Sequence, residues 1–368
     1  MSKKFKYVDP KKVMDSSDQL IRVLDIDGKL IDSKYKTSLS NEKIIEAYTW
    51  MVRSRQQDTY MTQLQRQGRM LTFAPNFGEE ALQVATSLAM EKDDWFLPAF
   101  RSNATMLHLG VPMINQMVYW NGNERGSKIP EGVNVLPVNI PIATQYSHAA
   151  GVAYGMKLLG KKNVAVTIIG NGGTAEGEFY EAMNVSSIHN WPVVFTVNNN
   201  QWSISTPEHL ETKATIAAKA HAVGIPGVRV DGNDLLASYE VMKEAVEWAK
   251  EGNGPVLVEF YTWRQGVHTS SDNPRIYRTE EMEKEKEKWE PMHRIKNYMI
   301  EKGFWTEEQD QKLWEDSLTL VKETYEESMK MHDIPVDEVF DYTYEKLPPY
   351  LERQKAEAKE WFEKKGGK

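Results

Sequence analysis

The sequence predicts an α/β fold, with a mostly parallel sheet and helices on both of its faces. Short runs rich in Val, Ile and Phe alternate along the chain with stretches whose apolar residues recur at helical spacing. These short runs are continuously apolar, which is typical of strands buried on both faces. One of them, Val164 to Ile169, leads into a cluster of glycines and then into another helical stretch. Such repetition of strand and helix favours a parallel sheet.

The individual elements follow in order. A first helix is expected from Ile44, with Ser40 among the residues that can cap it, and a second is expected from Glu79 through Met90. Strands are expected at 164–169, 193–197, 228–230 and 256–261, and helical stretches at 174–188, 207–222 and 235–249.

The chain divides into three parts on composition. Residues 1–40 are polar and rich in lysine, and we interpret them as an N-terminal arm. Residues 41–278 form the predicted α/β domain. Residues 279–368 are rich in Glu and Lys and predict a C-terminal helical extension with a solvated face.

Composition excludes several classes of protein. The 368 residues carry a net charge of −8, which argues against nucleic-acid binding because a phosphate-binding surface needs a basic surplus. With no cysteine, the chain has no disulfide, thiolate metal site or cysteine nucleophile. No apolar run approaches the roughly 18 residues of a membrane helix. We therefore expect a soluble, cytoplasmic protein without membrane contact.

The most informative segment is the glycine turn, Gly170 to Gly173, between a predicted strand and a predicted helix. Backbone N–H groups and a helix N-terminus at such a turn bind anions. The segment also fits the Gly-x-Gly-x-x-Ala dinucleotide fingerprint, which would indicate a nicotinamide-dependent Rossmann dehydrogenase. That interpretation needs an acidic residue after the next strand, where Asn198, Asn199 and Asn200 stand instead.

These asparagines and the glycine turn follow neighbouring strands, whose carboxyl ends meet at one edge of a parallel sheet. Amide oxygens there could bind Mg²⁺ shared with a diphosphate. Taken alone, the asparagines favour an ordinary turn.

The motif Gly170-Asn171-Gly172, the spacer 173–198 and Asn199-Asn200 resemble the thiamine diphosphate motif Gly-Asp-Gly…Asn-Asn. The stretches 97–101, 130–137 and 264–272 add to the likeness. Together they resemble the alpha subunit of the pyruvate dehydrogenase component in the 2-oxo acid dehydrogenase complex family, over roughly residues 45 to 345. The resemblance implies a thiamine diphosphate-binding fold.

The resemblance also assigns residues to roles. Thiamine diphosphate and Mg²⁺ are the implied cofactors, and His268 is the implied catalytic residue that helps position the 2-oxo acid. The implied metal ligands are Asn171, Asn200 and the backbone carbonyl of Trp202. The implied cofactor-binding residues are Phe100, Arg101, Ile142, Gly170, Gly172, Gly173, Asn200, Arg264 and His268.

Two positions depart from the family pattern. Phe100 stands where a tyrosine is usual, so a hydroxyl contact is missing. Asn171 stands where the family has a carboxylate, although Mg²⁺ sites usually include one or two carboxylates. Glu176 and Glu178, in the first turn of the next helix, are candidates to supply the missing charge.

The implied reaction is decarboxylation of pyruvate with reductive acetylation of a lipoyl group. The implied partners are a beta subunit, in an α2β2 heterotetramer, and a lipoyl-bearing dihydrolipoyl acetyltransferase. Alternatives are a branched-chain 2-oxo acid or acetoin dehydrogenase alpha subunit, the Rossmann dehydrogenase above, and a non-catalytic assembly subunit.

Overall fold

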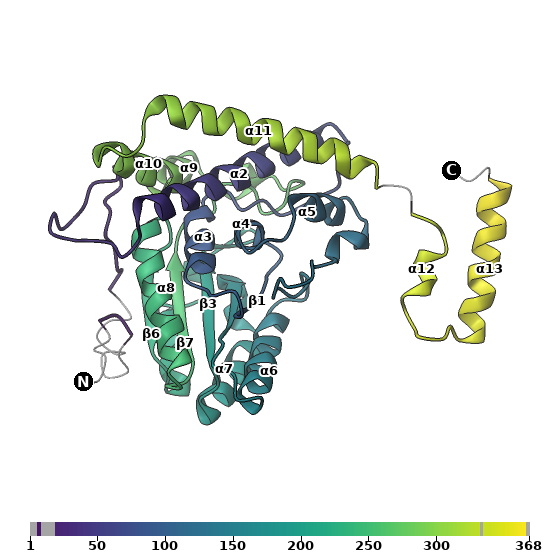
Figure 1. Cartoon of the computed structure of the whole chain (residues 1–368), viewed down its shortest axis with the longest axis horizontal. Helices are drawn as coiled ribbons and strands as arrows, with labels where there is room; N and C mark the ends of the chain where they lie inside the picture. The colour runs from purple at the N-terminus through teal and green to yellow at the C-terminus, as the bar shows by residue number, and fades with distance from the viewer. Residues whose placement is uncertain (1–5, 9–18, 332–333, 366–368) are drawn as a thin grey trace.

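The computed structural model describes residues 6–8, 19–331 and 334–365. Its centre is a five-stranded sheet in the order β1-β2-β3-β7-β6, in which every neighbouring pair is parallel (Figure 1). The sheet confirms the predicted α/β fold. Its strands are β1 (Trp95–Leu97), β2 (Ala165–Gly170), β3 (Val193–Asn199), β6 (Gly227–Asp231) and β7 (Val256–Tyr261). A small antiparallel pair, β4 (Trp202–Ser203) and β5 (Thr206–Pro207), lies beyond the end of β3.

The helices follow the predicted alternation through the α/β part of the chain. They are α2 (Asn41–Arg66), α3 (Glu80–Leu88), α4 (Asn103–His108), α5 (Met113–Trp120), α6 (Thr144–Leu158), α7 (Gly177–His189) and α8 (Leu235–Lys250), followed by α9 (Glu280–Glu285), α10 (Pro291–Glu301), α11 (Glu307–Met329), α12 (Glu338–Asp341) and α13 (Pro349–Lys364). Short 3-10 turns used below are η4 (Glu208–Leu210) and η5 (Ala217–Val223). Ser40 caps α2 as predicted, since its side chain accepts a hydrogen bond from the Lys43 N–H.

Both faces of the sheet are covered by helices. Along β3, Val194 belongs to the core beneath α2, α3 and α8, whereas Val193, Phe195 and Val197 belong to the core beneath α6 and α7. This alternation is the two-residue period of a strand. Because both sets are apolar, β3 reads as a continuous hydrophobic run, which is why the sequence predicted a strand buried on both faces.

The predicted helical stretch over 207–222 is wrong. The segment contains the two short turns η4 and η5 instead of an α-helix. Polar contacts to the sheet hold it in that form: the Glu208 carboxylate accepts a hydrogen bond from Asn199 Nδ2 at 2.6 Å, and the Ala217 N–H donates to Glu259 Oε2 at 2.8 Å. These tertiary contacts override the local helical pattern.

The chain ends flank this body in different ways. Of the predicted arm, residues 1–5 and 9–18 lie outside the described residues, and Ile21 bridges Val230 at the β6 edge of the sheet. At the other end α10 and α11 pack against α2, while α13 lies away from the sheet beside α12 (Figure 1). An ion pair between Glu338 and Arg125 ties α12 to the body. The boundary predicted at residue 278 stays a prediction. None of the helices in the described part of the chain is long and apolar enough to span a membrane.

Candidate active site

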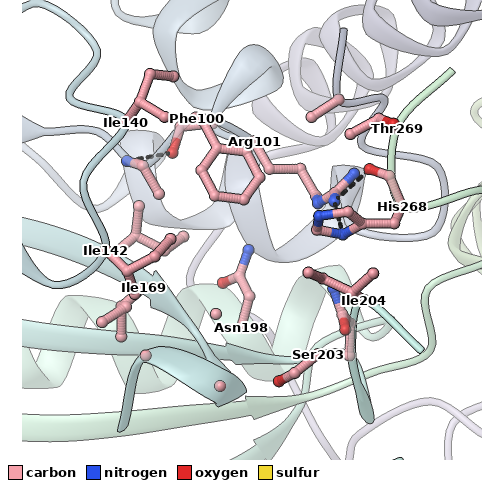
Figure 2. Close-up of a pocket in the computed structure, with 18 of the residues that line it drawn as sticks. Phe100, Arg101, Ile140, Ile142, Ile169, Asn198, Ser203, Ile204, His268 and Thr269 are labelled. Carbon is pink, nitrogen blue, oxygen red and sulfur yellow. Dashed lines mark hydrogen bonds between the residues drawn. The ribbon is translucent and has the colours of Figure 1, made fainter. Parts of the chain in front are cut away.

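A cavity of about 580 Å³ opens at the carboxyl ends of β2 and β3. Its base is the glycine turn and the residues that follow β3, and loops after β1 and β7 close its sides (Figure 2). Ligands of open parallel sheets bind at this edge. Of the residues singled out in the sequence, the cavity is lined by Phe100, Arg101, Ile142, Gly170, Gly172, Gly173, Asn200, Trp202 and His268.

Asn171 and Arg264 do not line the cavity but contact residues that do. The Asn171 side chain donates to Ser203 Oγ, and the backbone N–H of Arg264 donates to the Asn200 carbonyl oxygen at 3.1 Å. The fold therefore gathers all the predicted site residues at one edge of the sheet, although they come from segments far apart in the chain. Their individual roles stay predictions.

The glycine turn has no room for side chains at two positions. A Cβ on Gly172 would lie 2.2 Å from Ser203 Oγ, and a Cβ on Gly173 would lie 2.2 Å from Ile169 Cδ1. A side chain at Gly172 would displace Ser203, and one at Gly173 would displace the Ile169 side chain of β2. Close packing, and not a positive φ, therefore favours glycine at both positions. Gly170, Gly172 and Gly173 thus place backbone along the wall of the cavity.

Two buried amide oxygens beside the turn have no hydrogen-bond partner: Asn171 Oδ1 and Asn198 Oδ1. Their NH₂ groups are occupied, because Asn171 Nδ2 donates to Glu211 Oε2 at 2.6 Å and Asn198 Nδ2 donates to Glu79 Oε2 at 2.8 Å. Buried polar atoms normally have partners, so free acceptors here point to a ligand.

Glu79 was not singled out in the sequence, yet it organises the asparagine cluster. Its two carboxylate oxygens accept hydrogen bonds from Asn198 Nδ2 and, at 2.6 Å, from Asn200 Nδ2. Arg101 Nε lies 3.9 Å from the same carboxylate. Only the three-dimensional fold brings Glu79, at the start of α3, to the end of β3; no motif marks it.

Three buried arginines lie in this region: Arg101, Arg264 and Arg278. Arg278 forms an ion pair with Glu283 at 3.3 Å, and Arg101 lies near Glu79. Burial lowers the pKa of Arg264 to about 9, and the charges of Arg101 and Arg278 act in the same direction. Arg264 Nε and Nη1 are buried without a hydrogen-bond partner. A buried cation with unused donors is costly unless an anion binds it, so this cluster fits a diphosphate.

The third nitrogen of the Arg264 guanidinium, Nη2, holds a strained loop. Arg264 Nη2 donates to the carbonyl oxygen of Ile204 at 2.7 Å. Ile204 has a φ of 55°, a left-handed conformation that is unfavourable for a β-branched residue. Strain of this kind persists where surrounding contacts enforce it, and it is common at functional sites.

His268 lies against the arginines. Its Nδ1 is 3.3 Å from Arg101 Nη2, and since a guanidinium only donates, Nδ1 is the acceptor and the proton is on Nε2. Burial, together with the charges of Arg101 and Arg264, lowers the pKa of His268 to about 4. His268 is therefore neutral at pH 7, with an N–H available for donation.

The residues present fit a divalent cation and a diphosphate together better than a cation alone. No group of three or more histidine and carboxylate side chains in the described part of the chain could hold a metal ion. The free amide oxygen of Asn171 and the arginine cluster instead supply neutral and cationic contacts. Such a donor set suits Mg²⁺ whose negative charge comes mainly from phosphate oxygens.

The comparisons with known proteins agree with this geometry. Residues 48–336 match the family described as "Dehydrogenase E1 component". The chain is 52% identical to "Pyruvate dehydrogenase E1 component subunit alpha" of Mycoplasma pneumoniae over 344 residues, which is 93% of this chain and 96% of that protein. Proteins of the same name from Acholeplasma laidlawii and Staphylococcus aureus (strain Mu50) are 44% and 37% identical, covering 92% and 91% of this chain and 99% and 91% of theirs.

These matches overturn the Rossmann dehydrogenase alternative, which already lacked its ribose-binding acid after β3. The match extends through the parallel sheet, the glycine turn and the His268 loop. This chain belongs to the dehydrogenase E1 component family.

Proposed function

We propose that this chain is the alpha subunit of a thiamine diphosphate-dependent pyruvate dehydrogenase E1 component. It would decarboxylate pyruvate and reductively acetylate the lipoyl group of a dihydrolipoyl acetyltransferase. The names of its relatives support the substrate, and the cavity supports the cofactor. The observation that carries the proposal is the buried arginine cluster with unused N–H donors beside a glycine turn.

Arg101 and Arg264 would bind the diphosphate, together with backbone N–H groups of the glycine turn. Mg²⁺ would be held by the amide oxygens of Asn171 and Asn200 and by the carbonyl of Trp202. When bound, thiamine diphosphate would supply the carbanion chemistry needed for decarboxylation of a 2-oxo acid. The protein positions it and balances its charge.

His268 would donate a hydrogen bond from Nε2 to an oxygen of the bound 2-oxo acid. The contact from Arg101 fixes the tautomer, and the lowered pKa keeps the ring neutral at physiological pH. The backbone of the loop is held as well, because the backbone N–H of His268 donates to Asp272 Oδ2 at 2.9 Å. An oriented neutral imidazole is suited to moving a proton at this position.

The mouth of the cavity supports the proposed beta partner. Ile140, Ile142 and Ile204 line it and are 50%, 47% and 58% exposed (Figure 2). Apolar residues gathered at the rim of a polar site are typical of a surface that a protein partner covers. We propose that a beta subunit covers this rim in an α2β2 heterotetramer and supplies the glutamate that activates the cofactor's aminopyrimidine ring. A cytoplasmic location stays a prediction.

The test is to measure decarboxylation of pyruvate by the purified chain alone and after addition of its beta subunit, with thiamine diphosphate and Mg²⁺. We expect negligible turnover from the chain alone and full turnover from the mixture. A parallel assay with 3-methyl-2-oxobutanoate checks the substrate. Near-full activity of the isolated chain, or a preference for the branched substrate, would contradict the proposal.

A further inference from the structure

The proposed metal site lacks a carboxylate among its own ligands. Asn171, Asn200 and the Trp202 carbonyl are all neutral, although Mg²⁺ sites in proteins usually include one or two carboxylates. Glu176 and Glu178, the candidates in the sequence, make no hydrogen bond with Asn171, and Glu176 is exposed to solvent. The charge must therefore come from elsewhere in the fold.

Glu211 places a carboxylate in direct hydrogen-bond contact with Asn171. It follows η4, in the segment where the sequence wrongly predicted a helix, and its Oε2 accepts a hydrogen bond from Asn171 Nδ2 at 2.6 Å. Its Oε1 lies 3.7 Å from where a Cβ on Gly172 would be. The carboxylate thus lies directly over the glycine turn.

This contact also fixes which way the Asn171 amide faces. A carboxylate accepts hydrogen bonds only, so the NH₂ group must point toward Glu211, and Ser203 Oγ accepts from the same nitrogen at 3.2 Å. The amide oxygen is then left free, and it is buried with no partner. Asn171 is therefore held in the orientation that a metal ligand requires.

We propose that Glu211 supplies, through Asn171, the negative charge that an aspartate at position 171 would otherwise give to the Mg²⁺ site. The inference rests on the proposed cofactor site and adds a positioning residue to it. Outer carboxylates that hydrogen-bond to metal ligands orient them and increase their donor strength. Asn171 would thus be the metal ligand, and Glu211 would supply the negative charge.

The test measures free Mn²⁺ by electron paramagnetic resonance during titration of the assembled alpha and beta subunits at a fixed concentration of thiamine diphosphate. Glu211→Gln keeps the side-chain shape and an oxygen acceptor for Asn171 but removes the charge. We expect it to weaken Mn²⁺ binding by about 10- to 100-fold, the usual effect of losing such an outer partner. Glu176→Gln is the matched control at the same cavity, and we expect unchanged Mn²⁺ binding.

A charge swap separates this role from a merely structural one. Asn171→Asp alone places two carboxylates against each other, so we expect the cofactor-free protein to unfold at a lower temperature than the wild type. The double variant, Asn171→Asp with Glu211→Gln, returns the site to one carboxylate and one amide. We expect it to recover both the unfolding temperature and Mn²⁺ affinity.

The outcomes distinguish the two proposals. If the wild-type assembly binds no Mn²⁺ with thiamine diphosphate, the proposed function fails and this inference fails with it. If the wild type binds Mn²⁺ and Glu211→Gln binds it equally well, only the role of Glu211 is overturned. Equal losses in Glu211→Gln and Glu176→Gln, or a double variant that does not recover binding, would also overturn it.

Discussion

The two ends of the cavity differ in the polarity and the exposure of their side chains. At the inner end and directly behind it lie the buried side chains of Asn198, Asn171 and Arg264, all of which carry polar atoms without partners. The outer end presents apolar side chains, among them Ile140 and Ile204, to solvent. Each end bears an unfavourable feature for an isolated chain: buried unpaired polar groups inside and exposed hydrophobic groups outside. The contrast supports the proposal that the inner end binds a small anion and that the outer end is covered by a protein partner.

The largest expected effect belongs to the residue between the two ends. His268→Ala should lower turnover of the assembled enzyme by about 10²- to 10⁴-fold, the usual range for a residue that moves protons. Thiamine diphosphate binding should change little, because the arginines remain. Steady-state kinetics together with calorimetric titration of the cofactor would show this separation. Near-normal turnover would reduce His268 to an ordinary loop histidine.

A charge placed at the outer end should disrupt assembly without affecting the inner end. Ile140→Asp would bury an unpaired carboxylate beneath the beta subunit, so we expect affinity between subunits to fall at least about 30-fold, equivalent to about 2 kcal/mol. Ile188→Asp is the control, since Ile188 is 67% exposed on α7 and does not line the cavity. Analytical ultracentrifugation of both variants with the beta subunit measures the difference. Equal behaviour of the two variants would argue against a partner at this rim.

Removing charge from the inner end should weaken cofactor binding and leave subunit assembly unaffected. Arg264→Met keeps the volume of the side chain but deletes its charge, so we expect thiamine diphosphate to bind about 10- to 100-fold more weakly, equivalent to about 1.5 to 3 kcal/mol for a charge-assisted contact. The cofactor-free protein should unfold at the same temperature or higher, because a buried cation with unpaired donors is removed. A variant that loses stability but keeps cofactor affinity would show that Arg264 serves the fold alone.

The sequence anticipated the inner end far better than the outer one. The glycine turn and the asparagines follow neighbouring predicted strands, so the sheet edge where they meet could be predicted, whereas the arginines were assigned through the family resemblance. Glu79 and Glu211 were missed because each reaches the site through contacts across the fold: Glu211 lies 40 positions from Asn171 in the chain. The rim of isoleucines was also invisible, since an apolar residue in a loop has no pattern that tells exposure from burial.

The same reasoning explains the error over 207–222. A helix there would satisfy the local spacing of apolar residues, but it would remove Glu208 from Asn199 and Glu211 from Asn171. Side-chain hydrogen bonds to the end of the sheet outweigh helix propensity, which amounts to well under about 1 kcal/mol per residue. The segment for which the sequence wrongly predicted a helix is thus the one that brings Glu208 and Glu211 to the site.

The smallest expected effect is a shift in the pKa of His268. This pKa depends on the balance of charge around the inner end of the cavity. Burial and the two nearby guanidinium groups lower the pKa of His268 from an ordinary value of 6.5 to about 4. A folded-state pKa below the unfolded value means that this residue's contribution to the free energy of unfolding is complete above pH 6.5 and is lost as the pH falls toward 4.

A histidine ring NMR titration of the cofactor-free protein, with His268→Gln to assign the signal, should give a midpoint near 4. Added inorganic pyrophosphate should raise that midpoint, because an anion beside Arg101 and Arg264 offsets the charges that oppose protonation. Arg264→Met should raise it without any anion and should make it less sensitive to pyrophosphate. If pyrophosphate left the midpoint unchanged in the wild type, the anion would bind away from the arginines, and the contrast between the two ends of the cavity would lose its basis.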